Sequence, residues 1–188
     1  GMRINSASDD AAGVAISSRL SAEIRGTNQS IRNALDGQSL IDTAEGAHKE
    51  VENLLQRMRE LAIQAANGTN DADDITNLEA EFTALSTEIT RIGEVTSFAG
   101  KALTGTDATA FSFQVGSGTA TANQIYVTIN SIKSASIGTD SGTQLSAVVT
   151  AGLDDLTETN AAIVVIDDAI KEVNTQRSEL GAVSNRLN

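Results

Sequence analysis

The stretch Ala44–Ala65, with the sequence AEGAHKEVENLLQRMRELAIQA, decides how this chain folds. Mostly apolar residues recur along it at alternating intervals of four and three positions. Such spacing, which averages about 3.5 residues, keeps one stripe of side chains facing a partner helix as two helices wind around each other. The pattern predicts a long helix with a coiled-coil seam made of Ala44, His48, Val51, Leu55, Met58, Ala62 and Ala65.

Two further segments carry the same alternation. The first seam is Ile75, Leu78, Phe82, Leu85, Ile89, Ile92 and Thr96, and the second is Ile163, Ile166, Ile170, Val173, Arg177, Leu180, Ser184 and Leu187. We therefore expect helices at about residues 8–66, 71–97 and 156–188. The fold class predicted is mainly α with a small β-hairpin region, in which the helices form an elongated, antiparallel, coiled-coil-like rod.

The first helix has predicted boundaries and one alternative. Ser6–Asp9 resembles a capping box, Asn67-Gly68 predicts a left-handed C-cap, and Asn70 is the expected N-cap of the next helix. A single helix over 8–66 would be about 90 Å long. A compact domain of this size would be only about 40 Å across. The alternative is a break near Gly37, giving two helices of about 45 Å each.

The middle of the chain is rich in Gly, Ser and Thr. Alternating apolar residues over 111–115 and 125–129 predict a β-hairpin with a long loop. Residues 131–150 are polar, and we expect an exposed, weakly structured excursion there. The predicted organisation is therefore a helical rod domain formed by residues 1–104 and 153–188, with a short variable insertion over 105–152.

Composition excludes several functions. The 188 residues carry a net charge of −12, whereas a nucleic-acid or anionic-membrane binder needs a basic face. The chain has no Cys and a single His, which excludes thiolate chemistry and multi-His metal sites. Aromatic residues make up 3%, too few for a ring-lined small-molecule pocket. We expect no cofactor, no bound metal, and neither a nucleic-acid nor a membrane partner.

Three local patterns have a structural and a chemical interpretation. Gly116–Thr121 begins like a dinucleotide fingerprint but lacks the third glycine and the helix, so a hairpin loop is favoured. Asp71, Asp73 and Asp74 begin like a calcium loop without completing its spacing, so acids at a helix N-terminus are favoured. His48 stands on the apolar stripe without a partner acid or nucleophile, which favours a packed residue. We predict that the chain is not an enzyme.

One cluster on the first helix suggests a protein contact. Arg57 and Leu61 are four residues apart and share a helix face, with Glu60 beside Arg57. Leu61 lies off the seam stripe, so we expect it to be half exposed. An exposed Leu beside an Arg can anchor a protein–protein contact.

Several blocks of the sequence resemble bacterial flagellin. They include residues 3–13 (RINSASDDAAG), 57–61 (RMREL), 66–70 (ANGTN) and 173–187 (VNTQRSELGAVSNRL). The resemblance covers about residues 3–104 and 156–188, in order. It implies a helical rod built from both halves of the chain, with a variable region inserted between them.

The resemblance also implies what the chain lacks. In flagellins, terminal helices outside the rod form the innermost tube of the filament. This chain begins near the Arg-Ile-Asn block and stops after Asn-Arg-Leu, so it is identified as a rod-domain core lacking those helices. Flagellins without them generally do not polymerise, and we expect a monomer.

The flagellin rod is also bound by Toll-like receptor 5. The contact positions that the resemblance carries over are Gln56, Arg57, Leu61 and Glu88. Glu88 lies between two seam residues and is expected to point outward. The competing interpretation is that these residues make rod–rod contacts in the filament, and the two surfaces are expected to overlap.

The function implied is a structural subunit of the flagellar filament, used in motility. Such a subunit is exported by the flagellar apparatus, lies outside the cell, and has other flagellin subunits as partners. The alternative is a hook-associated junction protein or an adhesin-type rod protein of the cell surface, related to flagellin. Some flagellins carry a peptidase in the insertion, but this sequence has no His-Glu-x-x-His motif.

Overall fold

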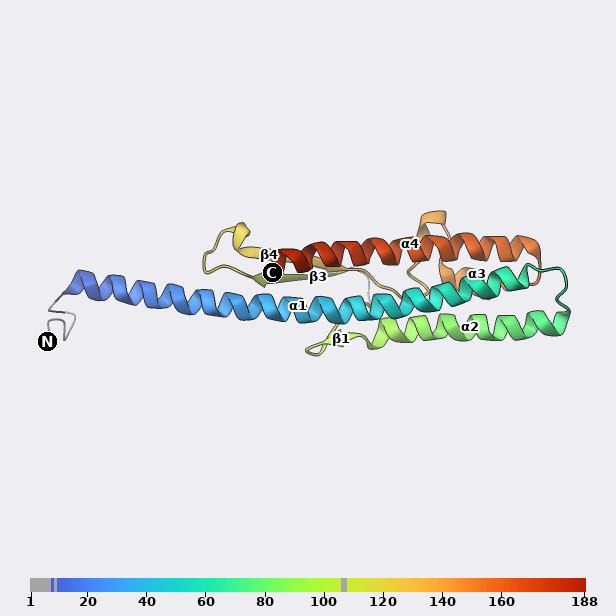
Figure 1. Cartoon of the computed structure of the whole chain (residues 1–188), viewed down its shortest axis with the longest axis horizontal. Coiled ribbons are helices and arrows are strands. Elements are labelled where there is room, and N and C mark those ends of the chain that lie inside the picture. Colours follow the sequence, from blue (N-terminus) through green and yellow to red (C-terminus); the bar gives the residue numbers. More distant parts are fainter. Residues whose placement is uncertain (1–7, 9, 106–107) are drawn as a thin grey trace.

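Three long helices make the molecule a rod. The computed structural model describes residue 8, residues 10–105 and residues 108–188. Helix α1 (Ala11–Ala65) runs the length of the molecule, and α2 (Ala72–Val95) folds back along its C-terminal half. Helix α4 (Leu156–Leu187) lies antiparallel to α1 on another side (Figure 1). The N-terminal part of α1 projects beyond the end of α4, which confirms the elongated helical fold class.

The remaining elements connect α2 to α4. Strands β1 (Ser97–Phe98) and β2 (Lys101–Ala102) form a short antiparallel pair. The predicted hairpin is confirmed as β3 (Thr109–Gln114) paired with β4 (Gln124–Ile129), with Phe111 opposite Val127. The Gly116–Thr121 stretch lies in the loop of this hairpin, as favoured from the sequence. Two 3-10 turns, η1 (Thr121–Asn123) and η2 (Thr139–Ser141), and the short helix α3 (Leu145–Ala151) complete the described elements.

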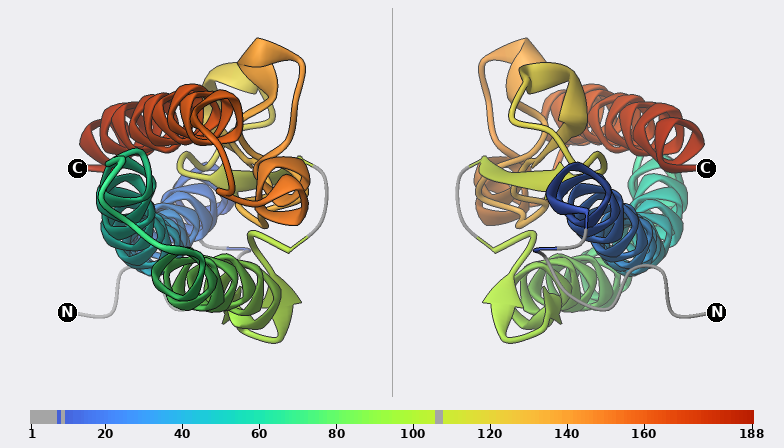
Figure 2. Two further views of the ribbon diagram at one scale, coloured as in Figure 1. Left: turned by 90° about the vertical axis from the view of Figure 1, so that its right-hand side faces the viewer. Right: turned by 90° about the vertical axis from the view of Figure 1, so that its left-hand side faces the viewer.

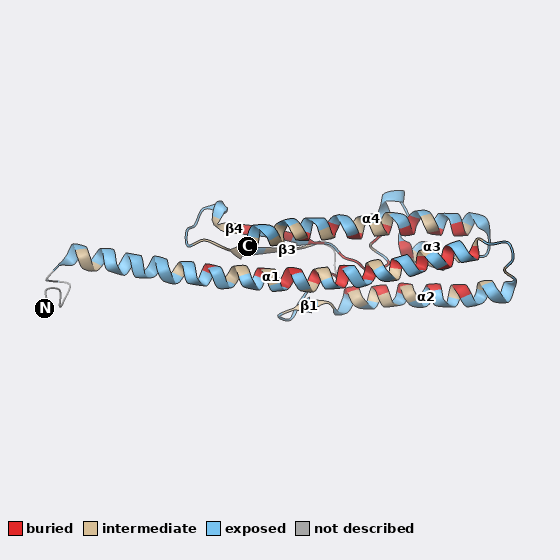
Figure 3. Ribbon diagram, in the orientation of Figure 1, coloured by how far each residue is buried: buried red, intermediate tan, exposed pale blue. Residues whose placement is uncertain are grey.

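The helices pack around a main core in a ring. Each helix contacts the next in the order α1, α2, α3, α4 and back to α1, as the end-on views show (Figure 2). All seven predicted seam residues of α1 are buried (Figure 3). In the other two predicted seams the buried residues are Leu78, Phe82 and Ile89 of α2 and Ile166, Val173 and Leu180 of α4, and the rest are half-buried. A second apolar cluster forms where the middle of α1 and the end of α4 cover the hairpin. Its buried members are Leu40, Ile41, Ala44, Leu103, Val127, Ile129 and Leu180.

Helix α1 is continuous through Gly37, so the alternative with a break at that residue is wrong. A Cβ at Gly37 would lie 3.0 Å from Cδ1 of Leu187 and 3.2 Å from Cγ of Phe113. The glycine therefore allows α4 and the hairpin to approach α1 closely. At the start of the helix, Asp10 is the N-cap and its Oδ1 accepts from the backbone N–H of Gly13 at 2.9 Å. The capping box predicted at Ser6–Asp9 lies outside the described residues.

The turn between α1 and α2 differs in its caps from the prediction. Gly68 is not left-handed, and the C-cap of α1 is Ala66, in a right-handed conformation with φ of −70°. Asn70 does not cap α2, because its Nδ2 donates to the carbonyls of Gln64 and Asn67, each at 2.7 Å. Asp71 is the N-cap instead, in a reciprocal capping box with Asp74. The interpretation of the acids as helix N-terminal residues is confirmed, since Asp73 and Asp74 occupy the first turn.

The expectation of a weakly structured excursion over residues 131–150 is wrong. Ile132 and Ile137 are 2% and 3% exposed, and Leu145 and Val148 of α3 are also buried in the main core. These apolar residues are few and widely spaced among many Ser and Thr residues. The polar composition therefore gave no sign that this segment is packed and closes the helix ring.

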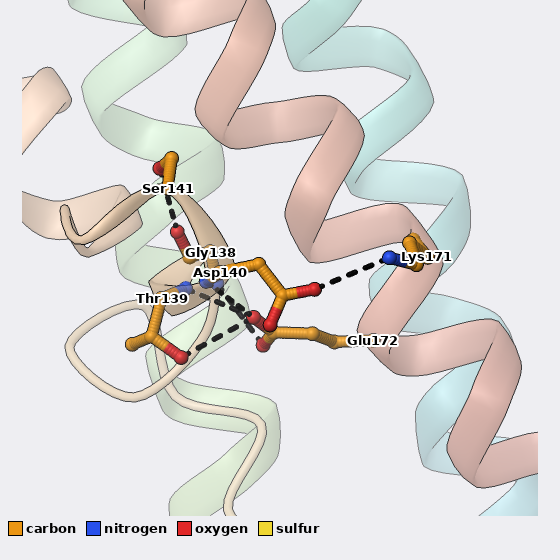
Figure 4. A network of polar contacts seen from close by, with 6 residues as sticks. All are labelled: Gly138, Thr139, Asp140, Ser141, Lys171 and Glu172. Carbon is orange, nitrogen blue, oxygen red and sulfur yellow. Dashed lines mark hydrogen bonds and ion pairs between the residues drawn. The ribbon is translucent and has the colours of Figure 1, made fainter.

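A carboxylate on α4 holds this segment in place. Oxygens of Glu172 accept hydrogen bonds from the backbone N–H groups of Gly138 (3.1 Å), Thr139 (2.9 Å) and Asp140 (3.3 Å). Lys171 adds an ion pair to Asp140 at 3.4 Å (Figure 4). Gly138 itself has φ of +85°, a conformation that side chains rarely adopt. We call these contacts between α4 and η2 the Glu172 clasp.

Candidate functional site: the α1–α2 face

Arg57 lies where α1 and α2 run side by side. Its Nε and Nη2 donate to the two carboxylate oxygens of Glu81 on α2, at 2.9 and 3.2 Å. Its Nη1 donates to Oε2 of Glu60, one turn along α1, at 3.1 Å. The two-point contact with Glu81 fixes the plane of the guanidinium. Arg57 remains 46% exposed, so the cluster faces solvent with a defined orientation.

The hydrogen bonds to Glu81 are the largest cause of a raised pKa for Arg57. Those to Glu60 come next. The guanidinium is therefore permanently charged. Because the group is exposed, this pairing orients the side chain more than it stabilises the fold.

Glu81 was missed in the sequence, although a signal for it exists. Arg57 and Glu81 each stand twelve positions from Thr69, in the middle of the turn between the two helices. Two antiparallel helices joined by a short turn bring residues equidistant from that turn to the same level. The position of the turn could therefore have identified the partner of Arg57.

Glu88 lies on the same face of α2 as Glu81, seven residues further on. Its side chain is 40% exposed, which agrees with the outward direction expected. Arg91 donates from Nε to Oε2 of Glu88 at 2.8 Å, and its hydrogen bonds are the largest cause of a lowered pKa for Glu88. The structure therefore places Glu88 and Arg57 on one helix pair, but each is bonded to a different partner.

Leu61 is not half exposed, and that expectation is wrong. Its exposed fraction is 0%, and it belongs to the main core. A single heptad stripe describes contact with one partner, whereas α1 contacts both α2 and α4 and buries a wider arc. The neighbouring Gln56 is exposed, so Gln56, Arg57 and Glu88 are accessible to solvent while Leu61 is not.

On another face of α1, Arg59 makes a different contact. Its Nε donates to Oδ1 of Asp167 on α4 at 2.7 Å. Arg57 and Arg59 thus link α1 to opposite neighbours, although only one residue separates them. A variant at Arg59 therefore removes the same charge from a different contact and can serve as a control for a variant at Arg57.

Two further features are absent from the described residues. Within residue 8, 10–105 and 108–188, no group of three or more His, Asp or Glu side chains could hold a metal ion. In the same part of the chain, none of the helices is both long and apolar enough to cross a bilayer. What the α1–α2 face offers is a fixed pattern of exposed charge over a packed apolar layer.

Comparison with known proteins gives consistent relatives. Residues 1–108 match the family model of the bacterial flagellin N-terminal helical region. A flagellin of Halalkalibacterium halodurans is 43% identical over 187 residues, which is 100% of this chain and 65% of that protein. Flagellin C of Vibrio cholerae is 54% identical over 117 residues, 62% of this chain and 31% of that protein. The chain therefore spans about two thirds of the first relative and about one third of the second.

Solved structures agree. The crystal structure of Bacillus cereus flagellin is similar with a TM-score of 0.63 and 30% identity, over 84% of this chain and 85% of that one. A Vibrio parahaemolyticus protein described as flagellar hook-associated has a TM-score of 0.74 over 97% of this chain and 91% of its own. Its identity is only 19%, so that likeness concerns the fold alone.

Proposed function

The chain belongs to the bacterial flagellin family, and we propose that it is the rod of a flagellar filament subunit. The observation that carries the proposal is the 43% identity to a flagellin over the whole chain, together with the rod shape. Its role is structural rather than catalytic, its partners are other flagellin subunits, and it works outside the cell after export. Residues 105–152 are the inserted unit, docked on a rod made by residues 1–104 and 153–188.

The alternative roles have less support. A hook-associated junction protein would share the fold, as the Vibrio parahaemolyticus neighbour does, but the sequence identity lies with flagellins. An adhesin-type rod protein has no specific observation in its favour. We therefore place the chain in the filament itself.

A chimera tests the filament role. This chain replaces the matching segment of the Halalkalibacterium halodurans flagellin, in a strain without its own flagellin gene. Filaments visible by electron microscopy and motility in soft agar are expected. A chimera that is exported and folded but never forms filaments, while the unmodified flagellin does, would contradict the role.

A second proposal is recognition of the rod by Toll-like receptor 5. Gln56, Arg57 and Glu88 are accessible on one helix pair, and the guanidinium of Arg57 is held rigidly. Arginine in a fixed orientation is a frequent anchor of protein interfaces. Leu61 is fully buried in the main core, so it takes no direct part in this surface. The same surface can serve rod–rod contacts in the filament.

Receptor signalling tests this proposal. Arg57→Ala and Glu88→Ala should each raise the concentration needed for half-maximal signalling by about tenfold, as loss of an interface anchor does. Arg59→Ala removes the same charge from a different face and should leave signalling unchanged. Equal potency of the Arg57 and Arg59 variants would rule out the α1–α2 face as the receptor contact.

A further inference from the structure

A polar layer interrupts the seam between α1 and α4. His48 and Arg177 both occupy seam positions, and Arg177 is ion-paired to Glu52 and, at 3.5 Å, to Glu45. The layer falls between the two apolar clusters of the rod. The main cluster reaches it with Val51 and Val173, and the second cluster begins on its other side with Ala44 and Leu180.

His48 is completely buried, with an exposed fraction of 0%. Its Nδ1 lies 2.7 Å from the carbonyl oxygen of Ala44. Because a carbonyl only accepts hydrogen bonds, Nδ1 carries the hydrogen, and Nε2 is the unprotonated nitrogen of the neutral ring. Nε2 has no hydrogen-bond partner among the described residues. A proton added there would become a buried charged donor without an acceptor, which is costly.

The surroundings of His48 have opposing effects on its protonation. Burial and the nearby Arg177 oppose its protonation, whereas Glu45 and the hydrogen bond to Ala44 favour it. Burial is the largest effect, and the pKa of His48 lies below 6.5. The charged groups near the layer are Glu45 and Glu52 on α1, Lys171, Glu172, Arg177 and Glu179 on α4, and Asp140 on η2.

A groove open to solvent lies beside the layer. The groove, of about 520 Å³, is lined by His48, by Asn130 and Ser131 after the hairpin, and by Gln176 and Glu179 of α4. Its lining mixes apolar side chains with polar ones such as Asn130, Ser131 and Gln176, which can hydrogen-bond water, so an opened layer can be hydrated from this side. The two clusters on either side consist of apolar residues, whose packing does not depend on protonation.

We propose that the His48–Arg177 layer is a proton-sensitive joint of the rod, at which protonation of His48 opens the α1–α4 seam while the main cluster stays packed where α1 and α2 meet. This goes beyond the proposed filament role, because it divides the rod into two parts with different response to acid. The joint would let the end of the rod that carries the hairpin move relative to the end that carries the α1–α2 turn.

The direction with pH follows from where the proton is held. The opened seam binds a proton at His48 more readily than the closed seam, because the opened ring is hydrated. The closed state is therefore fully favoured above pH 6.5 and loses stability as the pH falls below it. His48 has a higher pKa in the opened seam than in the closed one. As the pH falls from the first pKa to the second, the closed-to-open ratio falls about tenfold for each pH unit.

Two measurements test the joint. His48 is the one histidine of the chain, so its ring signals in an NMR titration report its pKa directly. Hydrogen exchange, corrected for the intrinsic rate at each pH, reports local opening. Between pH 7.5 and 5, protection should fall at residues 44–52 and 173–180 and persist at residues 78–89. In His48→Leu, which restores an apolar seam residue, the protection of the seam should not change with pH.

The outcomes separate clearly. A His48 pKa below 6.5 together with acid-sensitive protection that His48→Leu abolishes supports the joint. A pKa at or above 6.5 overturns it, and so does an equal loss of protection in His48→Leu. The titration uses the unmodified chain, so the proposal remains falsifiable even if the variant does not fold.

Discussion

Leu61 and Ile63 are two positions apart on α1 and have opposite surroundings. Leu61 is 0% exposed and packs in the main core, whereas Ile63 is 49% exposed. Leu61→Ala should lower the free energy of unfolding by about 2–5 kcal/mol, because it removes buried methyl groups and leaves a cavity. Ile63→Ala should change it by less than about 1 kcal/mol. Urea unfolding followed by circular dichroism measures both, and equal losses would contradict the burial of Leu61.

The same residue shows what a heptad pattern can predict. The stripe identified seven residues of α1 that are all buried, because a period of about 3.5 residues keeps them on one side of the helix. It placed Leu61 outside the core, because the contact of α1 with a second helix produces no second regular repeat of apolar residues in the sequence. For the candidate site, Arg57 and Glu88 could be selected by resemblance. Their partners could also have been identified, Glu81 from its distance to the turn and Arg91 from its i,i+3 spacing to Glu88, but not the hydrogen-bond geometry that orients each pair.

At the scale of elements, the start of α2 depends on Asp71. Its Oδ1 accepts from the backbone N–H of Asp74 at 2.8 Å, and Oδ2 of Asp74 accepts from the N–H of Asp71 at 3.0 Å. Asp71→Ala should destabilise the protein by about 1 kcal/mol, as loss of an N-cap does. Asp71→Asn keeps an acceptor and should stay within a few tenths of a kcal/mol. Thermal unfolding distinguishes them, and identical behaviour of the two variants would exclude the capping role.

The segment that closes the helix ring gives a second test. Gly138 and Gly142 both have φ near +85°, at +85° and +83°. A Cβ at Gly138 would lie 2.6 Å from Cγ1 of Val165, whereas one at Gly142 would meet nothing within 4 Å. Gly142→Ala should cost about 1 kcal/mol for the left-handed backbone alone. Gly138→Ala should cost about 2 kcal/mol or more, because Val165 must also move. Chemical denaturation that ranks the two variants in the opposite order would show that the packing of η2 on α4 is not tight.

Some of these elements could be predicted from the sequence and others could not. Long helices and the hairpin follow from periods of apolar residues, and their boundaries agree with the prediction within a few residues. The caps of the α1–α2 turn do not, because Asn70 and Asp71 are both good N-caps and only the geometry of the turn decides between them. The buried apolar residues of segment 131–151 do not recur at a regular interval, so no periodic pattern predicts their burial. The segment is held against the rod by the Glu172 clasp and by the packing of α3.

At the scale of the whole molecule, the rod results from where apolar surface is placed. The main core lies at the α1–α2 turn, and the second cluster lies further along α1 beside the hairpin. The two clusters follow one another along α1, whose buried residues in them run from Leu40 to Ala65. The seam therefore extends along one axis, with the His48–Arg177 layer between its two apolar parts. A long lateral surface of this kind suits subunits that pack side by side.

The continuity of α1 gives the last prediction, the solution size of a monomeric rod. Its 55 residues span about 80 Å at the helical rise, whereas a compact chain of this length has a radius of gyration near 16 Å. Small-angle X-ray scattering should therefore give a maximum dimension of at least about 80 Å and a radius of gyration well above about 16 Å. Forward scattering should correspond to the monomer mass of 19.5 kDa at every concentration, which excludes end-to-end assembly as the source of the length. A monomer with a maximum dimension near 40–50 Å would mean that α1 folds back on itself in solution, as a break near Gly37 would require.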